Sequence, residues 1–152
     1  MLRAKVLEAE MISCTEFIPA YSELFKFLDQ HDKLVDFWHN LADNFLENLR
    51  VHIEKEGLAG CYNYWSHTLT EEAADFSMEL DEEKGVFHID MRYCPSMGRL
   101  LESKHLEPFS RYCDHCDHLY QPLVEQFGFI YKSEIDSKHA RCKIWISRPQ
   151  KV

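Results

Sequence analysis

Three cysteines within one short stretch are the residues best suited to chemistry. Residues 93–117 (YCPSMGRLLESKHLEPFSRYCDHCD) contain Cys94, Cys113 and Cys116, and Cys142 follows in a strand-like run near the C-terminus. An ionised thiol is both a nucleophile and a metal ligand, and aspartates and histidines flank the last two cysteines of the stretch. We therefore expect the chemistry of the protein here.

The residues around Cys113 are predicted to form a helix over 111–127, with Ser110 as its N-cap. Cys113 then occupies the third helical position, where the positive end of the helix dipole favours the thiolate. The same helix face carries, three, four and seven positions further on, Cys116, Asp117 and Tyr120. This face therefore combines a nucleophile or ligand, a second sulfur, a carboxylate and a phenol. Pro122 is expected to kink the helix or end it early.

Two functional interpretations of the thiols are open from the sequence. In the first, a tetrahedral zinc ion is bound by Cys94, Cys113, Cys116 and Cys142. His115 could replace one sulfur, and the Cys-x2-Cys spacing supports this interpretation, although a second such pair is missing. In the other, a metal-free pocket holds one activated thiol and one carboxylate. A simpler role, packing as a small hydrophobic residue, is expected for Cys14 and Cys61.

The elements that position these residues begin with helices. Residues 3–13 and 16–29 predict two short helices. Residues 33–55 predict the longest helix, because apolar side chains recur at three- and four-residue steps, and Gly57 and Gly60 are expected to end it. Residues 58–70 are rich in aromatic side chains and are interpreted as a loop packed on the core, with the lining of a pocket as the alternative.

From residue 73 the apolar period changes to two, which predicts strands. Residues 73–81 and 86–93 form one β-hairpin, and residues 129–135 and 140–147 form a second. A short helix over 97–104, capped by Ser96, follows the first hairpin. The inward face of the first hairpin is predicted to carry Phe87, Ile89, Met91 and Tyr93. The order predicts an α+β fold, with N-terminal helices packed on a small, mainly antiparallel four-stranded sheet and two further helices between its hairpins.

Composition limits the class of protein further. A length of 152 residues suits a single domain, with a helical part over 1–57 and a cysteine-containing α+β part over 70–148. A net charge of −9 argues against nucleic acid or an anionic membrane as partner. We find neither a signal peptide nor an apolar run of roughly 18–20 residues, so we expect a cytoplasmic protein with reduced cysteines. The expected partner is a small-molecule ligand or substrate, and the sequence leaves a homo-oligomer open.

The C-terminal half resembles the L-2-amino-thiazoline-4-carboxylic acid hydrolase family over about residues 86–147. The resemblance is carried by Tyr93-Cys94-Pro95, Tyr112-Cys113-Asp114-His115-Cys116-Asp117 and Arg141-Cys142-Lys143-Ile144. It implies water addition at the C=N carbon of a cyclic isothiourea, with the ring sulfur leaving to give N-carbamoyl-L-cysteine. The chain departs from the family pattern at Cys116 and at Lys143, where we expect acids.

Such a reaction needs a base or nucleophile, an acid for the leaving thiolate and a cation for the substrate carboxylate. Our hypothesis assigns catalysis to Cys94, Cys113, Asp117 and Cys142. It assigns substrate binding to Arg92, Arg111 and Tyr120. Tyr120 or His118 could serve as the acid for the leaving thiolate, and Arg99 and Arg141 are further candidates to hold the substrate carboxylate. The chain is also similar to the ligand-sensing domains of the vinyl-reductase type, which bind small molecules, some with a structural zinc, without turning them over. A structural partner protein with a dry core is the third possibility.

Overall fold

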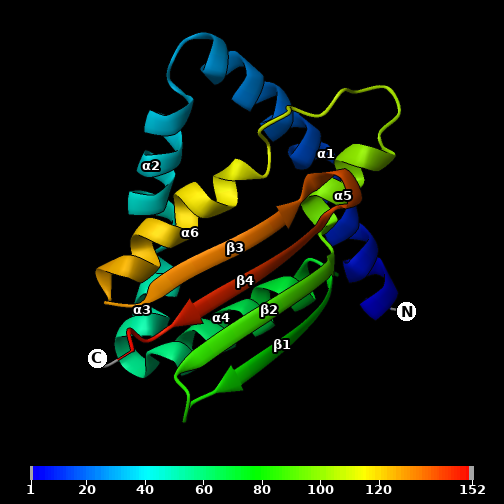
Figure 1. The fold of residues 1–152 in the computed structure, drawn as a ribbon. Coiled ribbons are helices and arrows are strands. Elements are labelled where there is room, and N and C mark those ends of the chain that lie inside the picture. The colour runs from blue at the N-terminus through cyan, green and yellow to red at the C-terminus, as the bar shows by residue number, and fades with distance from the viewer. Residues whose placement is uncertain (1, 151–152) are drawn as a thin grey trace.

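The computed structural model describes the backbone of residues 2–150 and the side chains of residues 16–150, so Cys14 lies outside the described side chains. The elements of this part are α1 (Leu2–Gln30), α2 (Leu34–Phe45), α3 (Glu47–Glu56), α4 (Leu58–Glu71), β1 (Asp75–Asp81), β2 (Val86–Tyr93), α5 (Pro95–Glu102), α6 (Asp114–Gln126), β3 (Ile130–Asp136), a 3-10 turn (Ser137–His139) and β4 (Arg141–Ser147). The predicted α+β class is confirmed (Figure 1).

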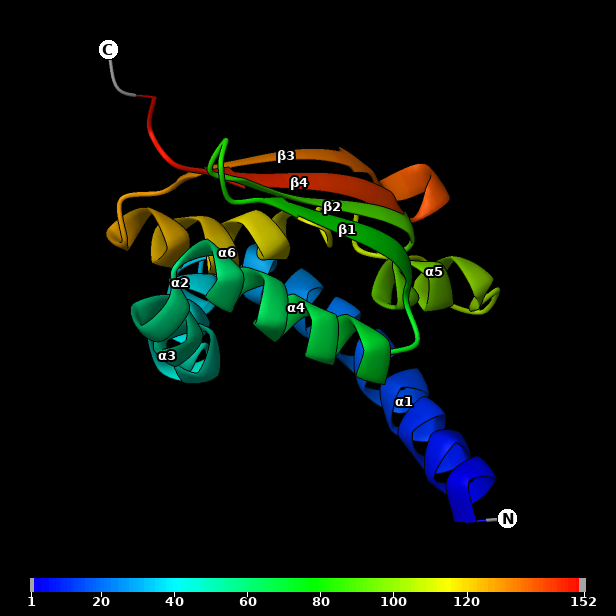
Figure 2. The ribbon, with the colours of Figure 1, turned by 90° about the horizontal axis from the view of Figure 1, so that it is seen from below.

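The four strands form one antiparallel sheet in the order β1-β2-β4-β3, so the two predicted hairpins join through β2 and β4. The helices cover one face of the sheet, and the other face is open (Figure 2). Because side chains alternate across a strand, Phe87, Ile89 and Met91 point to the helices and are buried, as predicted. Their partners on β4 include Ile144 and Ile146, which are also buried.

The core consists of two clusters that meet near Cys94. The larger cluster lies between the sheet and α2, α3, α4 and α6. The smaller one joins α1, α2, α5 and the segment before α6, around Phe25 and Trp38. Ser22 of α1 is buried against the segment before α6. Its Oγ accepts a hydrogen bond of 3.0 Å from the Phe109 N–H. The segment that carries Cys113 is thereby fastened to α1.

The N-terminal helices differ from the prediction in two ways. The helices expected over 3–13 and 16–29 are one helix, α1, which continues through Pro19. The helix expected over 33–55 is divided at Leu46, whose backbone (φ −91°, ψ 26°) leaves the helical region. Leu46 is only 2% exposed, so the break lets its side chain enter the core. Gly57 (φ 58°) ends α3 as predicted, because its N–H bonds to the Ile53 carbonyl in a backbone conformation that favours glycine.

Residues 58–70 form the helix α4, and the loop interpretation is wrong. Leu58, Cys61, Trp65 and Leu69 recur at three- and four-residue steps and are all buried. Gly60 is required by packing: a Cβ there would lie 2.0 Å from the His52 carbonyl oxygen of α3. The glycine that seemed to end a helix therefore permits a close contact between two helices.

The helices beside the thiols also begin elsewhere than predicted. Helix α6 begins at Asp114, not at Arg111, and continues through Pro122 to Gln126. Helix α5 begins at Pro95 with Cys94, not Ser96, as its N-cap, because proline suits the first helical position. In the described part of the chain, no helix has the length and apolar character needed to cross a membrane.

Candidate functional site

The four cysteines Cys94, Cys113, Cys116 and Cys142 line one small hollow, which we call the thiol pocket. Its volume is about 30 Å³. All four side chains are partly buried and none forms a disulfide. The structure thus brings together the sulfurs that the sequence singled out. The space between them has room for on the order of one or two water molecules.

Strand ends and the start of α6 position these thiols. Cys94 follows β2, and its N–H donates a 2.7 Å hydrogen bond to the Ala140 carbonyl just before β4. Cys142 on β4 pairs with Met91 on one side and Ile135 on the other, so it faces the helices with the other inward residues of the sheet. Cys113 is the N-cap of α6 and Cys116 lies in its first turn.

Burial keeps the four thiols protonated at neutral pH. It raises the pKa of Cys94 to about 11, and the neighbouring Cys116 sulfur adds to the shift. Burial also raises the pKa of Cys113 and of Cys116 to about 12. The pKa of Cys142 is raised by burial and then by the other three sulfurs. The prediction that the helix dipole makes Cys113 a thiolate is wrong, because Cys113 precedes the first helical residue and desolvation dominates.

The arrangement of the thiols does not fit a bound metal. Within the described side chains, no group of three or more His, Cys, Asp or Glu residues is placed to hold a metal ion. The zinc interpretation therefore has no support from this geometry.

Asp117 also borders the thiol pocket, but both its oxygens are engaged. Oδ1 accepts a 3.1 Å hydrogen bond from the Tyr131 hydroxyl, and Oδ2 accepts one of 2.8 Å from Ser133 Oγ. Both donors come from β3. The carboxylate therefore fastens α6 to the sheet in addition to lining the pocket.

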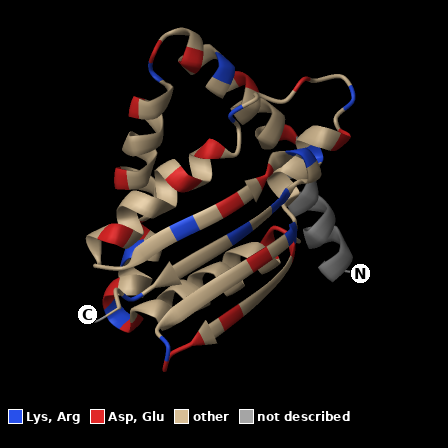
Figure 3. Cartoon of the chain, viewed as in Figure 1, with Lys and Arg blue, Asp and Glu red and all other residues tan. Residues whose placement is uncertain are grey.

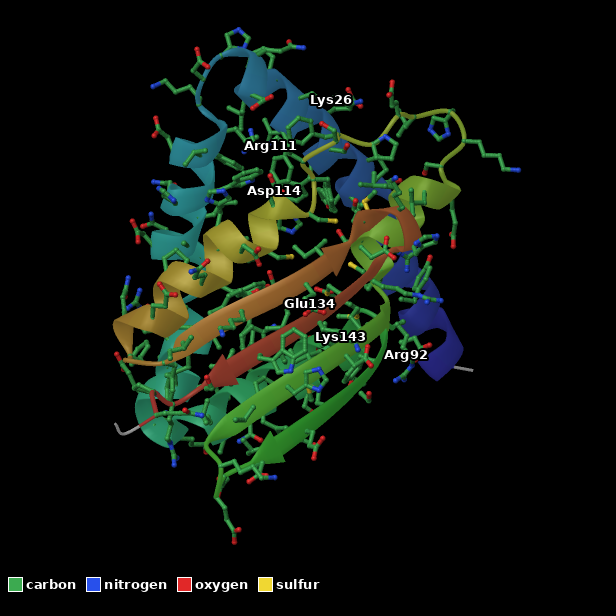
Figure 4. All side chains as sticks on the ribbon, in the orientation of Figure 1. Lys26, Arg92, Arg111, Asp114, Glu134 and Lys143 are labelled. Carbon is green, nitrogen blue, oxygen red and sulfur yellow. The ribbon has the colours of Figure 1, made fainter. Side chains whose placement is uncertain are left out.

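The two arginines expected to bind substrate do not lie with the thiols. Arg92 is on the open face of the sheet, where its guanidinium bonds Asp75 at 2.6 Å. Arg111 precedes α6 and bonds Asp29 at 3.2 Å and Asp114 at 3.0 Å. Figure 4 shows the two arginines on separate parts of the molecule, and Figure 3 shows acidic and basic residues distributed over helices and strands alike. Each arginine is already paired with a carboxylate.

His118 and Tyr120 point away from the thiol pocket as well. The His118 ring stacks on Trp38 with 4.8 Å between ring centroids. Tyr120 borders a different and larger hollow between α1, α2, α5, α6 and the end of α4, which we call the helical cavity. Its volume is about 310 Å³. Mostly aromatic and aliphatic side chains line it, and the lining residues with polar groups are Tyr21, Glu72, Ser96, Tyr112, His115 and Tyr120.

Glu72 is the C-cap residue of α4 and directs a carboxylate to the helical cavity. The residue is exposed to solvent, yet partial desolvation raises the pKa of its carboxyl group despite the opposing field of His115. None of the hydrogen bonds or ion pairs among the described side chains involves this carboxylate. Glu72 is therefore an acid without a counter-ion beside an apolar space.

His115 connects the two hollows. Burial lowers the pKa of His115, so its imidazole is neutral at physiological pH. Nδ1 is hydrogen-bonded to the Tyr112 carbonyl, which can only accept, so Nδ1 carries the proton and Nε2 is bare. Nε2 lies 3.5 Å from Cys116 Sγ. The imidazole thus lines the helical cavity and also contacts a sulfur of the thiol pocket.

Fold and site together define a small α+β protein with an apolar cavity among its helices and a thiol cluster behind α6. No family model, no curated protein and no solved structure matches the chain. The resemblance to the thiazoline-carboxylate hydrolases stays a hypothesis.

Sequence reasoning missed the helical cavity and the role of Glu72. The cavity walls come from five elements, and Glu72 belongs to the end of a helix that was interpreted as a loop. His115 was considered only as a substitute metal ligand. The one available signal was the aromatic density of residues 58–70, which accompanies α4 but does not itself line the cavity.

Proposed function

We propose that the protein binds a small organic molecule in the helical cavity. The observation that carries this proposal is a space of about 310 Å³ with aromatic walls and a carboxylate that has no counter-ion among the side chains of residues 16–150. Ligand pockets in proteins are largely apolar, contain a few convergent polar groups and usually start at roughly 300 Å³. The cavity meets each of these conditions.

The thiol pocket supports ligand binding less well. Its 30 Å³ cannot admit a five-membered ring with substituents. Its acid, Asp117, already accepts two hydrogen bonds from β3. Of these two hollows, only the helical cavity is large enough for a ligand of that size.

Filling the cavity tests this function. Leu41 on α2 lines the cavity, whereas Val35 on the same helix is exposed and does not. Leu41→Trp is expected to weaken binding of the neutral naphthalene dye prodan at least about tenfold, because the indole occupies the space of the dye. The measurement is a fluorescence titration, with circular dichroism to show that the variant is folded.

Val35→Trp is the matched control, since it adds the same indole to α2 outside the cavity. It should leave the affinity for prodan within about twofold of wild type. Equal loss in both variants, or equal retention in both, would contradict binding in the helical cavity.

Hydrolysis of 2-aminothiazoline-4-carboxylate is the second candidate function. The contact that favours it is the 3.5 Å approach of Cys116 Sγ to the unprotonated His115 Nε2, a thiol and base pair held by the Tyr112 carbonyl. In the overall reaction water adds at C2 of the ring, the C2–S bond breaks and the leaving sulfur takes a proton.

Turnover measured as N-carbamoyl-L-cysteine tests this second candidate. Loss of turnover in Cys116→Ala, with retention in Cys61→Ala, would support it, because Cys61 is a buried core residue with no histidine contact among the described residues. Wild-type protein without turnover, or turnover that survives Cys116→Ala, excludes a catalytic role for this pair.

A further inference from the structure

We infer that the ligand of the helical cavity is an amphiphilic organic cation with a single positive charge, and that Glu72 is its counter-ion. The inference rests on the proposed function, since it requires that the cavity binds a ligand at all. Three features of the cavity lead to it: the charges of its lining, the missing partner of Glu72 and the aromatic walls.

The lining carries one formal charge. Among the described residues that border the cavity, Glu72 is the only acid, and no lysine or arginine is present. The one potential cation, His115, is neutral because burial disfavours its protonated form. A ligand carboxylate in this space would face Glu72 without a counter-charge. The lining therefore disfavours anions and zwitterions such as amino acids.

The neighbouring Glu71 shows what Glu72 lacks. Glu71 lies one residue earlier, points to solvent and has His67 Nε2 at 3.4 Å. Glu72 is exposed as well, but it borders the helical cavity and has no such partner among the described side chains. A ligand ammonium or amidinium group would supply this counter-ion and form a charge-assisted hydrogen bond.

The aromatic walls suit the rest of such a ligand. Tyr21, Phe25 and Tyr112 form a continuous series of rings, with centroids 6.1 Å and 5.5 Å apart. Ring faces attract cations as well as apolar groups. At the rim, Phe17 and Phe45 are 60% and 72% exposed, which is unusual for side chains of this size. The apolar part of a ligand would cover these two rings.

Three probes with one skeleton test the charge of the ligand. They are 4-phenylbutylamine, 4-phenylbutan-1-ol and 4-phenylbutyrate, which are cationic, neutral and anionic at pH 7. Isothermal titration calorimetry of the wild-type chain should show the amine binding at least about tenfold more tightly than the alcohol, and the butyrate most weakly. Added salt should weaken the amine only, because only that probe gains an ionic contact.

Glu72→Gln and the matched control Glu71→Gln locate the counter-ion. Glu72→Gln should remove the preference for the amine and leave the affinity for the alcohol unchanged, whereas Glu71→Gln should preserve the preference. The alcohol serves as a test of folding for both variants.

The possible outcomes separate the inference from the proposed function. If the alcohol binds as tightly as the amine, or the butyrate binds most tightly, the inference is overturned while a ligand-binding cavity remains. An amine preference that persists in Glu72→Gln also overturns it. If none of the three probes binds and prodan does not bind either, the proposed function fails.

Discussion

The thiol pocket and the helical cavity lie on two sides of α6 and differ in their volume and in the partners of their polar side chains. The thiol pocket contains the residue types that suggest chemistry, yet it is small, its thiols are protonated and its aspartate is bonded to β3. The helical cavity is made mainly of ordinary core residues, yet it is ten times larger and holds an acid with no partner among the described side chains. Environment, more than residue type, separates a candidate binding site from a packed cluster.

The largest expected effect concerns the helix that carries Glu72. Gly60→Ala places a Cβ 2.0 Å from the His52 carbonyl oxygen, and backbone atoms cannot move aside as a side chain can. We expect a loss of about 3 kcal/mol in the free energy of unfolding, together with loss of prodan binding, measured by urea denaturation and fluorescence titration.

Gly98→Ala is the matched change beside the thiol pocket. Its Cβ would lie 2.2 Å from the Tyr93 ring, which is partly exposed and able to rotate away. The loss should therefore be smaller than for Gly60→Ala, and prodan binding should persist. The reverse order of the two losses would show that α3–α4 packing does not maintain the helical cavity.

The second prediction uses the protonation of the thiols. Their pKa values are higher in the folded chain than in the unfolded chain, so the folded state holds more protons at alkaline pH. Stability should be complete below about pH 8.5 and fall as pH rises toward 11–12, with a loss of at least about 2 kcal/mol by pH 10. Urea denaturation at pH 7, 9 and 10 measures it.

Cys113→Ala with Cys116→Ala should flatten this pH dependence, since two of the five described thiols with raised pKa values are removed. A double variant with the same slope as wild type would show that the thiols are not the groups that titrate. Prodan binding should be the same in the double variant and in wild type, because neither cysteine lines the helical cavity.

A smaller effect is expected from the link between α6 and β3. Ser133→Ala removes the hydroxyl that donates 2.8 Å to Asp117 Oδ2. The loss of one hydrogen bond to a charged group should cost about 1–2 kcal/mol in the free energy of unfolding. Ser66→Ala, on the outer part of α4, is the control and should change stability little; an equal effect would contradict a special role for Asp117.

The smallest effects should come from the paired arginines. Arg92 bonds Asp75 on the open face of the sheet and lines neither hollow. Arg92→Ala should leave both prodan binding and thiazoline turnover, if there is any, unchanged, because exposed ion pairs contribute little. A tenfold loss in prodan binding or in turnover would contradict this prediction. It would support the substrate-binding role that the sequence suggested for Arg92.

Much of the fold could be predicted because local patterns carry it. Alternation over Val86–Tyr93 placed Phe87, Ile89 and Met91 on the buried face, and the turn residues between strands located both hairpins. The helices were less predictable where packing overrides the pattern. Leu46 interrupts a helix to enter the core, and Gly60 lies inside helical structure because α3 and α4 approach closely there.

The sequence by itself determined the α+β order, the inward faces of the strands and the identity of the four thiols, since these depend on residue type and short-range spacing. Only the tertiary structure decided the size of each hollow, the protonation of the thiols and the position of Glu72 beside the helical cavity. Cavity volume and desolvation depend on atoms from helices and strands that are distant in sequence. A local sequence pattern therefore does not predict either quantity. The four thiols can be identified from the sequence alone. Packing decides that Glu72, at the end of α4, borders the helical cavity.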